Sequence, residues 1–531
     1  MTAFDFVVVG SGAAGAAAAW KLTGQGFKVA LLDRGDWVDP ARYPSTGPDW
    51  ERAKRRHAHP SIAERQGPAD YPIDDSASPI AICNYNAIGG STILYSGHFP
   101  RFRPVDFELA SREGVGADWP IDYQTLRPYF EENEREMSAA GLAGDPKYPD
   151  IQDLLPPVPL GQAGTQLARA FNAKGWHWWP SYSAISTRAV RGRDACINLG
   201  PCNTGCPQGA KSSTDVTYIA KAQAKGLTVL PNHAVARVLI ENGRAVGVLA
   251  HDADGTARQI AARAVVLAAS AMGTSRILLN STGADAPNGL ANRSDQVGRN
   301  LMIHPLGYVE GVFPGALDTH IGPQGCMLYS LEHDRSPEAD HHLGYMMHVL
   351  RGTGPVETAI AAYQRRKLRF GPALHEDFDA FWRKQLVVSL ICEDLPDPEN
   401  RVTLDADRAD RFGVPGLRVS YRLSENCKKM MVHGMARAKE VLVEAGARRT
   451  YAAGPVRNTG WHVMGTARMG TDPDTSVVGP DGQAHDVAGL YVVDSSVFVT
   501  GSCVNPANTI QAVALCLADR MAQSAKLEGA A

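Results

Sequence analysis

Three apolar patterns follow one another at the beginning of the chain. Residues 4–9 form a short, nearly continuous apolar run, residues 13–24 are rich in alanine, and residues 29–32 are apolar again. Short apolar runs are typical of buried strands, whereas an alanine-rich stretch of this length favours a helix. The order therefore predicts a strand, a turn, a helix and a second strand, which is the βαβ unit of a parallel sheet.

The turn of this predicted unit is rich in glycine. Gly10 allows a tight turn after the first strand, Gly12 allows backbone N–H groups to approach a pyrophosphate, and Gly15 allows the helix to pack on the sheet. The helix N-terminus adds partial positive charge for phosphates. Asp33 follows Gly10 by 23 positions, which suits a carboxylate that binds ribose hydroxyl groups. Together these features predict a dinucleotide site, and the alternative is a βαβ turn without a ligand.

Hydrophobic periodicity beyond this unit indicates a mixture of strands and helices. Residues 227–269 carry short apolar or alternating runs separated by glycine-containing turns, which is typical of hairpins that lead back into a sheet. Residues 35–85 show little periodicity and are expected to cross the surface. Helices are expected at 118–139, 274–281 and 424–446, and strands at 385–393, 401–405, 417–421 and 489–494.

Composition limits the class of protein. A chain of 531 residues exceeds one ordinary core, so we expect two or three domains. A hydrophobic content of 44% is that of a globular protein, and a net charge of −3 gives no sign of a nucleic-acid partner. Nine cysteines do not indicate a disulfide scaffold. No run approaches the ~18 apolar residues of a membrane span, and the first predicted strand leaves no room for a cleavable signal, so we expect a cytoplasmic protein.

Two C-terminal segments carry residues suited to proton transfer. His462 lies between a tryptophan and a Gly-Thr turn, and Asn505 precedes a proline and a helix-like segment. Histidine is the side chain best matched to accept a proton near neutral pH. A lone histidine is more often structural, however, and proline is common at the first position of a helix. The residues alone therefore leave a structural role open for both.

Six segments, in the same order, resemble those of the glucose–methanol–choline (GMC) flavoprotein oxidoreductases. The resemblance covers nearly the whole chain, and within the family it is nearest to bacterial sugar and alcohol dehydrogenases and to pyranose oxidase. The segments are Gly10-x-Gly12-x-x-Gly15, Gly89-Gly90-Ser91-Thr92, Glu393-x-x-Pro396 with Asn400-Arg401-Val402-x-Leu404, His462-x-x-Gly465-Thr466-x-x-Met469-Gly470, Asp494-x-Ser496, and Asn505-Pro506-x-x-Thr509-Ile510.

The resemblance implies an α/β fold (α+β overall) with two domains. A Rossmann-like FAD-binding domain with a β-meander is expected from residues 1–100, 190–309 and 455–531. A substrate domain, built on an antiparallel sheet with helices, is expected from residues 101–189 and 310–454.

The resemblance also implies a bound FAD and the oxidation of an alcohol. His462 takes the family's role of catalytic base, and Asn505 orients the substrate hydroxyl. A sugar, glycoside or polyol is the expected substrate, with oxygen or another electron acceptor. A long-chain or aromatic alcohol stays open, and so does a flavoprotein subunit that passes electrons to a partner. The residues expected to hold the flavin are Gly10, Ser11, Gly12, Ala14, Gly15, Asp33, Arg34, Gly89, Gly90, Ser91, Thr92, Val235, Asp494, Ser495, Asn505, Pro506 and Thr509.

Two features concern further chemistry at the flavin. Several family members attach FAD to a histidine just after the Ser-Thr pair, but Ile93 follows here. Noncovalent FAD is therefore expected, with His98 as the alternative attachment point. The spacing Cys196-x5-Cys202-x3-Cys206 resembles that of iron–sulfur loops, yet three cysteines are one short of the usual four ligands. Free cysteines and no metal are the expectation.

Overall fold

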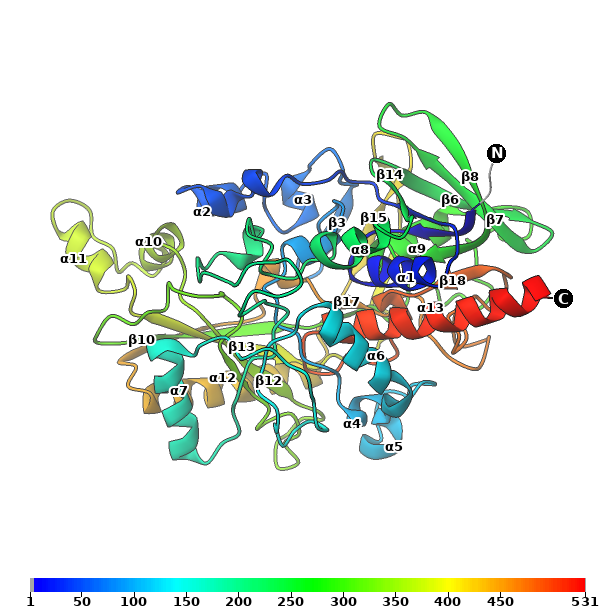
Figure 1. The fold of residues 1–531 in the computed structure, drawn as a ribbon. Helices are drawn as coiled ribbons and strands as arrows, with labels where there is room; N and C mark the ends of the chain where they lie inside the picture. Colours follow the sequence, from blue (N-terminus) through cyan, green and yellow to red (C-terminus); the bar gives the residue numbers. More distant parts are fainter. Residues whose placement is uncertain (1–3, 531) are drawn as a thin grey trace.

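The computed structural model describes residues 4–530 and contains two large sheets (Figure 1). The first is seven-stranded, with the order β5-β2-β1-β8-β7-β6 and β18 paired to β8. Strand β1 runs parallel to its neighbours β2 and β8, β2 runs parallel to β5, and β18 runs parallel to β8. Strands β6, β7 and β8 form an antiparallel meander. The α/β fold class with a meander is thus confirmed. The strands are β1 (Phe4–Val9), β2 (Val29–Leu32), β5 (Thr228–Leu230), β6 (Ala234–Glu241), β7 (Arg244–His251), β8 (Ala257–Leu267) and β18 (Leu490–Val492).

Small residues allow the helix after β1 to lie close to the sheet. Helix α1 (Ala13–Gly24) is buried along most of its length, including a run of alanines. A Cβ added at Gly15 would lie 1.8 Å from the Gly10 carbonyl oxygen, so only glycine fits this crossing of helix and turn. The C-terminal helix α13 (Ala507–Ala530) packs against α1 and against α6 (Tyr123–Glu136), as Figure 1 shows in red, blue and cyan.

The second sheet is six-stranded and antiparallel, with the order β16-β10-β13-β12-β11-β4. One face of it is covered by α12 (Glu425–Glu444), which contacts β10 and β13, and α7 (Gly161–Lys174) lies beside α12. All eight residues of β13 are buried, which indicates that both faces of this strand are covered. The strands are β4 (Trp179–Pro180), β10 (Leu306–Val312), β11 (Leu328–Ser330), β12 (Tyr345–Leu350), β13 (Gln385–Cys392) and β16 (Arg449–Ala453).

A small third sheet corrects one expectation from the sequence. Strands β14 (Arg401–Ala409) and β15 (Pro415–Ser420) pair with β3 (Ile73–Ala77), which lies inside the segment expected to cross the surface. Ile73 and Tyr71 of that segment are buried in a hydrophobic cluster with β15, so residues 35–85 contribute to the core. Residues 35–85 show no extended apolar periodicity, because their buried side chains belong to a five-residue strand and to isolated contacts.

Most of the helices predicted from periodicity are present with shorter bounds. The helix expected at 118–139 is α6, which begins after the N-cap Asp122, and the helix expected at 424–446 is α12, which begins after Ser424. The division into two domains stays a proposal, and β14 and β15 lie with β3 rather than in the six-stranded sheet. The remaining helices are α2 (Trp50–Lys54), α3 (Ile62–Arg65), α4 (Pro104–Phe107), α5 (Leu109–Glu113), α8 (Ala220–Gln223), α9 (Ser270–Asn280), α10 (Pro355–Gln364) and α11 (Ala373–Asp379).

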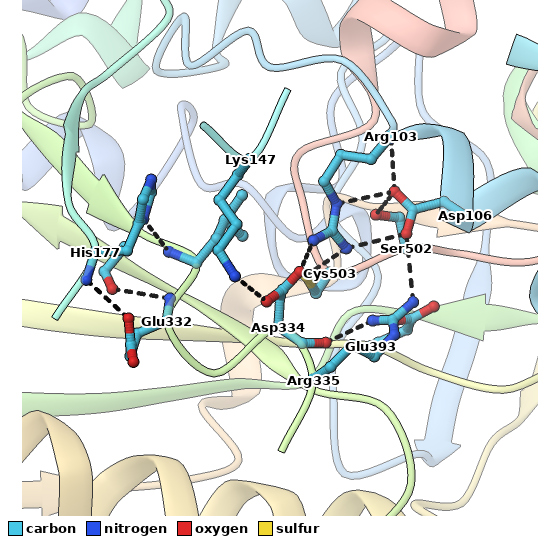
Figure 2. Close-up of polar contacts among 12 residues, drawn as sticks. Arg103, Asp106, Lys147, His177, Glu332, Asp334, Arg335, Glu393, Ser502 and Cys503 are labelled. Atoms are coloured by element: carbon cyan, nitrogen blue, oxygen red, sulfur yellow. Dashed lines mark hydrogen bonds and ion pairs between the residues drawn. The ribbon is translucent and has the colours of Figure 1, made fainter. Parts of the chain in front are cut away.

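A buried network of charges joins segments that are distant in sequence (Figure 2). Asp106 of α4 pairs with Arg103 at 3.0 Å, and Arg103 also contacts Asp334. Arg335 lies 3.6 Å from Asp106 and 3.1 Å from Glu393 at the end of β13. Figure 2 shows these groups converging from three elements, with cations and carboxylates alternating. Such an arrangement compensates the cost of taking each charge out of water.

The same network holds the loop that precedes α13. Ser502 donates a hydrogen bond of 2.8 Å to the Asp106 carboxylate, and Thr500 donates one of 3.1 Å to the Asp106 backbone carbonyl. Asp106 also accepts the backbone N–H of Arg103 at 2.7 Å, which fixes the start of α4. Asp106 therefore contacts both the start of α4 and residues 500 and 502 of the loop.

We expect Asp106→Ala to lower the free energy of unfolding by about 3–5 kcal/mol, because it removes a buried carboxylate that pairs with Arg103 and Arg335 and accepts the Ser502 hydroxyl. Glu108→Ala is the matched control: Glu108 forms an ion pair with Arg112 on the same segment, but its side chain is 46% exposed. The control should lose less than about 1 kcal/mol. Urea unfolding followed by circular dichroism measures both, and equal losses would contradict the role given to Asp106.

Candidate active site

A cavity of about 1000 Å³ runs from the glycine-rich turn after β1 to one face of the six-stranded sheet. This volume is at the upper end of the ~300–1,000 Å³ of ligand sites. Both parts of the predicted site lie in its wall, although they are separated by more than 400 positions in the sequence: Gly10, Ser11 and Gly12 at one end, His462 and Asn505 at the other.

The turn after β1 is open where a phosphate would approach. A Cβ added at Gly12 would have no neighbour within 4 Å, and Gly12 is the N-cap of α1 without a side-chain hydrogen bond to the first turn. The helix therefore directs unpaired backbone N–H groups and its positive end toward the cavity. At the end of β2, Asp33 accepts hydrogen bonds from Ser11 and from the Gly35 N–H, which orient the carboxylate at the cavity wall.

The structure brings most of the predicted cofactor residues to this wall. Gly15, Gly89 and Thr509 do not line it. Gly15 packs against the Gly10 carbonyl, the Gly89 N–H donates to Ser11 Oγ at 3.0 Å, and Thr509 Oγ1 accepts the N–H of Phe102 at 3.0 Å. The predicted residues in the wall are Gly10, Ser11, Gly12, Ala14, Asp33, Arg34, Gly90, Ser91, Thr92, Val235, Asp494, Ser495, Asn505 and Pro506.

Arg34 belongs to a cluster that the sequence did not indicate. Its guanidinium and that of Arg276 lie 4.7 and 4.6 Å from the ring of Tyr71. Both pair with the buried Asp410 of the β14–β15 hairpin, at 3.3 and 2.9 Å. The cavity wall near Asp33 includes Tyr71, Arg34 and Arg276. Through Asp410, the third sheet therefore contributes to the end of the cavity beside Gly10 and Gly12, called the dinucleotide end below.

At the opposite end, a short strand pair brings two histidines into contact, with their rings nearly perpendicular. Strand β17 (Val463–Met464) is antiparallel to β9 (Met302–Ile303), with Val463 opposite Ile303. The residue before Val463 therefore lies opposite the residue after Ile303. These are His462 and His304, whose Nδ1 atoms are 3.0 Å apart. His304 was missed at the sequence level because only this long-range pairing gives it a place in the site.

Asn505 lies just before α13 and connects His462 to His98. Its Nδ2 is 3.2 Å from His462 Nε2, and its Oδ1 is 2.7 Å from His98 Nδ1. Pro506, at the start of the helix, lines the cavity beside it. The predicted pair of His462 and Asn505 is thus in contact, and His98 is a third member.

One backbone carbonyl determines the protonation of the whole chain of side chains. His304 Nε2 lies 3.0 Å from the Gly501 carbonyl, which can only accept, so this nitrogen carries a proton. In a neutral imidazole the other nitrogen then accepts, and His462 Nδ1 must donate to it. His462 Nε2 is consequently unprotonated and accepts from the Asn505 amide. The hydrogen-bond network thus assigns to His462 the tautomer of a base directed toward Asn505.

Burial keeps these imidazoles neutral. It lowers the pKa of His462 well below 6.5, and the neighbouring His304 and His348 lower it further. Burial also lowers the pKa of His304 to about 4, and the pKa of His98 well below 6.5. A neutral His462 with an unprotonated Nε2 is the state that accepts a proton at neutral pH.

The cysteine loop lies beside the site and is tied to it by a buried lysine. Lys211 Nζ donates to the carbonyls of Ile93, Tyr95 and Cys202 at 2.6–2.7 Å, and burial lowers its pKa to about 8. Burial raises the pKa of the Cys202 thiol to about 11. Within residues 4–530, no group of three or more histidine, cysteine or acidic side chains is arranged to hold a metal ion. The absence of an iron–sulfur cluster stays a prediction.

The residues present fit a flavin dinucleotide. Gly12 leaves room at the turn, and Asp33 retains acceptor capacity because a carboxylate has about four lone-pair sites. The cavity continues without a break to His462 and Asn505. When bound, the cofactor would be held by the turn, Asp33 and the segments around Ser91 and Asp494, and it would supply an acceptor for two electrons and a hydrogen.

Comparison with known proteins places these features in one family. Two family models, both described as GMC oxidoreductase, match residues 4–306 and 396–514. The 2-methyl-1,2-propanediol dehydrogenase of Mycolicibacterium austroafricanum is 37% identical over 96% of this chain and 94% of that protein. The fructose dehydrogenase large subunit of Gluconobacter japonicus is 26% identical over 98% of both chains.

Solved structures share the fold at low identity. Pyridoxine 4-oxidase superposes with a TM-score of 0.66 and 17% identity over 97% of this chain and 98% of that chain. Formate oxidase of Aspergillus oryzae RIB40 gives a TM-score of 0.66 with 16% identity over 99% of both chains. The arrangement of the two sheets is therefore a known one.

The glycine-rich turn allows a test that separates folding from cofactor binding. Gly12 has φ −69°, which alanine adopts freely, and an added methyl group would project into open space. We expect Gly12→Ala to leave the stability of the flavin-free protein within about 1 kcal/mol of wild type. It should lower FAD affinity roughly tenfold or more, because the methyl group blocks close approach of the pyrophosphate.

Gly15→Ala is the control with the opposite outcome. Its methyl group would lie 1.8 Å from the Gly10 carbonyl, and overpacking of this kind costs about 1–3 kcal/mol or more. Thermal unfolding of the flavin-free proteins and FAD titration measure the two effects. Wild-type FAD affinity in Gly12→Ala would refute the phosphate site.

Proposed function

Because the chain belongs to the GMC oxidoreductase family, we propose that it is an FAD-dependent enzyme that oxidises an alcohol group to a carbonyl. The observation that supports this most directly is the unprotonated Nε2 of His462. It lies 3.2 Å from the Asn505 amide, in the cavity that also contains the dinucleotide turn. A base, an amide donor and a redox cofactor site in one cavity are what this reaction requires.

In the proposed reaction, the substrate hydroxyl replaces the Asn505 amide as the donor to His462 Nε2 and gives its proton to that nitrogen. The Asn505 Nδ2–H donates to the substrate oxygen and stabilises the negative charge that develops there. The carbinol carbon gives up its hydrogen as a hydride, and a bound FAD would supply the two-electron acceptor for it. The C–H bonding pair leaves with the hydride, and the oxygen lone pair freed by deprotonation forms the C=O bond. Proton and hydride are both accounted for.

His304 acts as a positioning residue in this scheme. His304 Nδ1 accepts the hydrogen bond from His462 Nδ1–H and so keeps the proton of His462 on that nitrogen. The His304 Nε2–H donates to the Gly501 carbonyl. Without an acceptor at this place, His462 would be free to carry its proton on Nε2, where it cannot accept the substrate proton.

The proposal extends to the substrate, the electron acceptor and the cellular location. Among the relatives, a diol dehydrogenase and a fructose dehydrogenase subunit favour a polyhydroxylated substrate. A long-chain-alcohol oxidase of Arabidopsis thaliana, 25% identical, keeps a long-chain alcohol as the second candidate. Within the described residues no helix is long and apolar enough to cross a membrane. We retain a cytoplasmic location, noncovalent FAD, and oxygen or a separate electron-transfer partner as acceptor.

The base assignment predicts a specific defect. His462→Ala should retain FAD, because His462 makes none of the dinucleotide-end contacts, but it should slow flavin reduction by about 10²–10⁴-fold. Asn505→Ala should slow the same step less, since it removes a donor but not the base. Anaerobic stopped-flow spectroscopy of flavin bleaching with an alcohol panel measures both. Near-normal reduction in His462→Ala would remove His462 from the mechanism.

The tautomer assignment predicts an effect of His304 and a pH profile. The lowered pKa of His462 means that the base loses its proton-accepting form only when the pH falls well below 6.5. Wild-type kcat/KM should therefore remain level from pH 8 to pH 6.5 and fall only well below pH 6.5. His304→Leu removes the acceptor for the His462 Nδ1–H and should lower kcat by up to about 10²–10⁴-fold.

His304→Asn is the matched control, because an asparagine oxygen can accept the same proton. It should recover part of the activity that His304→Leu loses. Equal activity of the two variants would show that His304 acts only through packing.

A further inference from the structure

The six-stranded sheet presents one face to the cavity, and an in-register row of polar side chains crosses that face. In β10, β13 and β12, alternate residues line the cavity, as the two-residue period of a strand requires. Tyr308 of β10 is paired with Ser389 of β13, and Ser389 is paired with His348 of β12. Their Cβ atoms are therefore about 4.5–5.5 Å apart from one strand to the next.

The polar atoms of this row are free for a ligand. Within the described residues, the Ser389 hydroxyl is buried without a hydrogen-bond partner, and the Tyr308 hydroxyl makes no hydrogen bond. His348 Nε2 lies 2.6 Å from the Gly325 carbonyl and so carries the proton, which leaves Nδ1 as an unpaired acceptor. The next residue along the ladder, Tyr329, lies outside the cavity wall, and its hydroxyl donates to Asp145.

The row begins beside the proposed base. The His348 ring stacks on His98 with the centroids 4.2 Å apart, and His98 contacts Asn505. His348 is also close enough to His462 to lower its pKa. From this end, the row continues through Ser389 to Tyr308. Val387 and Ile391, two residues away on β13 and also in the wall, flank the row with apolar surface.

We propose that Tyr308, Ser389 and His348 form a recognition row for the further hydroxyl groups of a polyhydroxylated substrate, such as a linear polyol or sugar. The inference rests on the proposed function and adds the residues that would distinguish a polyhydroxylated substrate from an alkyl alcohol. Hydroxyl groups on carbons beyond the one oxidised find a donor or acceptor about every 5 Å, and the flanking apolar residues contact C–H groups. A substrate with an alkyl chain instead leaves these buried polar groups without partners, which costs affinity.

The test compares six-carbon alcohols that differ only in their hydroxyl groups. FAD-loaded enzyme is mixed anaerobically with hexan-1-ol, hexane-1,2-diol, D-mannitol, D-glucitol or galactitol, and flavin bleaching gives a rate and an apparent Kd for each. The variants are Tyr308→Phe and Ser389→Ala, which remove one hydroxyl each and keep the shape of the side chain. Matched controls are Tyr182→Phe and Ser181→Ala, because both hydroxyls are buried and unpaired but lie outside the cavity wall.

We expect wild type to prefer at least one hexitol over hexan-1-ol. Each row variant should raise the apparent Kd of that hexitol about 3- to 10-fold, which is the effect of one hydrogen bond, and should leave its limiting bleaching rate unchanged. Values for hexan-1-ol should change less than twofold in every variant, and the controls should match wild type for all substrates.

The outcomes separate the two levels of the proposal. If no alcohol bleaches the wild-type flavin, the proposed function fails and the recognition row fails with it. If hexan-1-ol bleaches the flavin as well as or better than every hexitol, the recognition row is refuted while alcohol oxidation stands. The recognition row is also refuted if the row variants affect hexan-1-ol and the hexitol equally.

Discussion

The hydrogen bond from His304 to the Gly501 carbonyl is the interaction on which the proposed chemistry depends. A carbonyl accepts and never donates, so this single contact of 3.0 Å fixes the direction of every hydrogen bond that follows it, through His462 and Asn505 to His98. The direction holds only while the imidazoles are neutral, and their burial ensures this. Backbone geometry thereby determines which nitrogen of a side chain is basic.

That carbonyl is in turn positioned by groups outside the cavity. Residues 500 and 502, on either side of Gly501, are both bound by Asp106, whose carboxylate is neutralised by Arg103. The loop then leads into Asn505 and α13, which packs between α1 and α6. The network of Figure 2 therefore couples the stability of the molecule to the position of Gly501 and Asn505. A buried ion network is expensive to build, and a fixed active-site loop is a reason to retain one.

Patterns within short stretches of sequence correctly predicted individual helices, strands and turns. The βαβ unit, α6, α12, β13 and the opening at Gly12 follow from periodicity, caps and glycine geometry, and the resemblance located His462 and Asn505. His304 and His348 escaped prediction because a histidine carries no signal of its own, and only the β9–β17 and β12–β13 pairings bring them to the cavity. The region 35–85 was wrongly expected at the surface, since its partner strand β15 lies more than 300 positions away.

The two large sheets divide the work of the cavity in a way that follows from their geometry. In the parallel sheet, backbone groups at the turn after β1 would contact the phosphates of a bound dinucleotide. In the antiparallel sheet, alternate side chains along part of β10, β12 and β13 line the cavity, and α12 packs against the same three strands. We expect replacement of a cavity-facing residue without a structural hydrogen bond, such as Ser389, to alter what the site recognises while leaving the core behind the sheet in place. Substrate choice in this fold is therefore expected to be determined by the alternate positions of these three strands, and cofactor choice by the turn after β1.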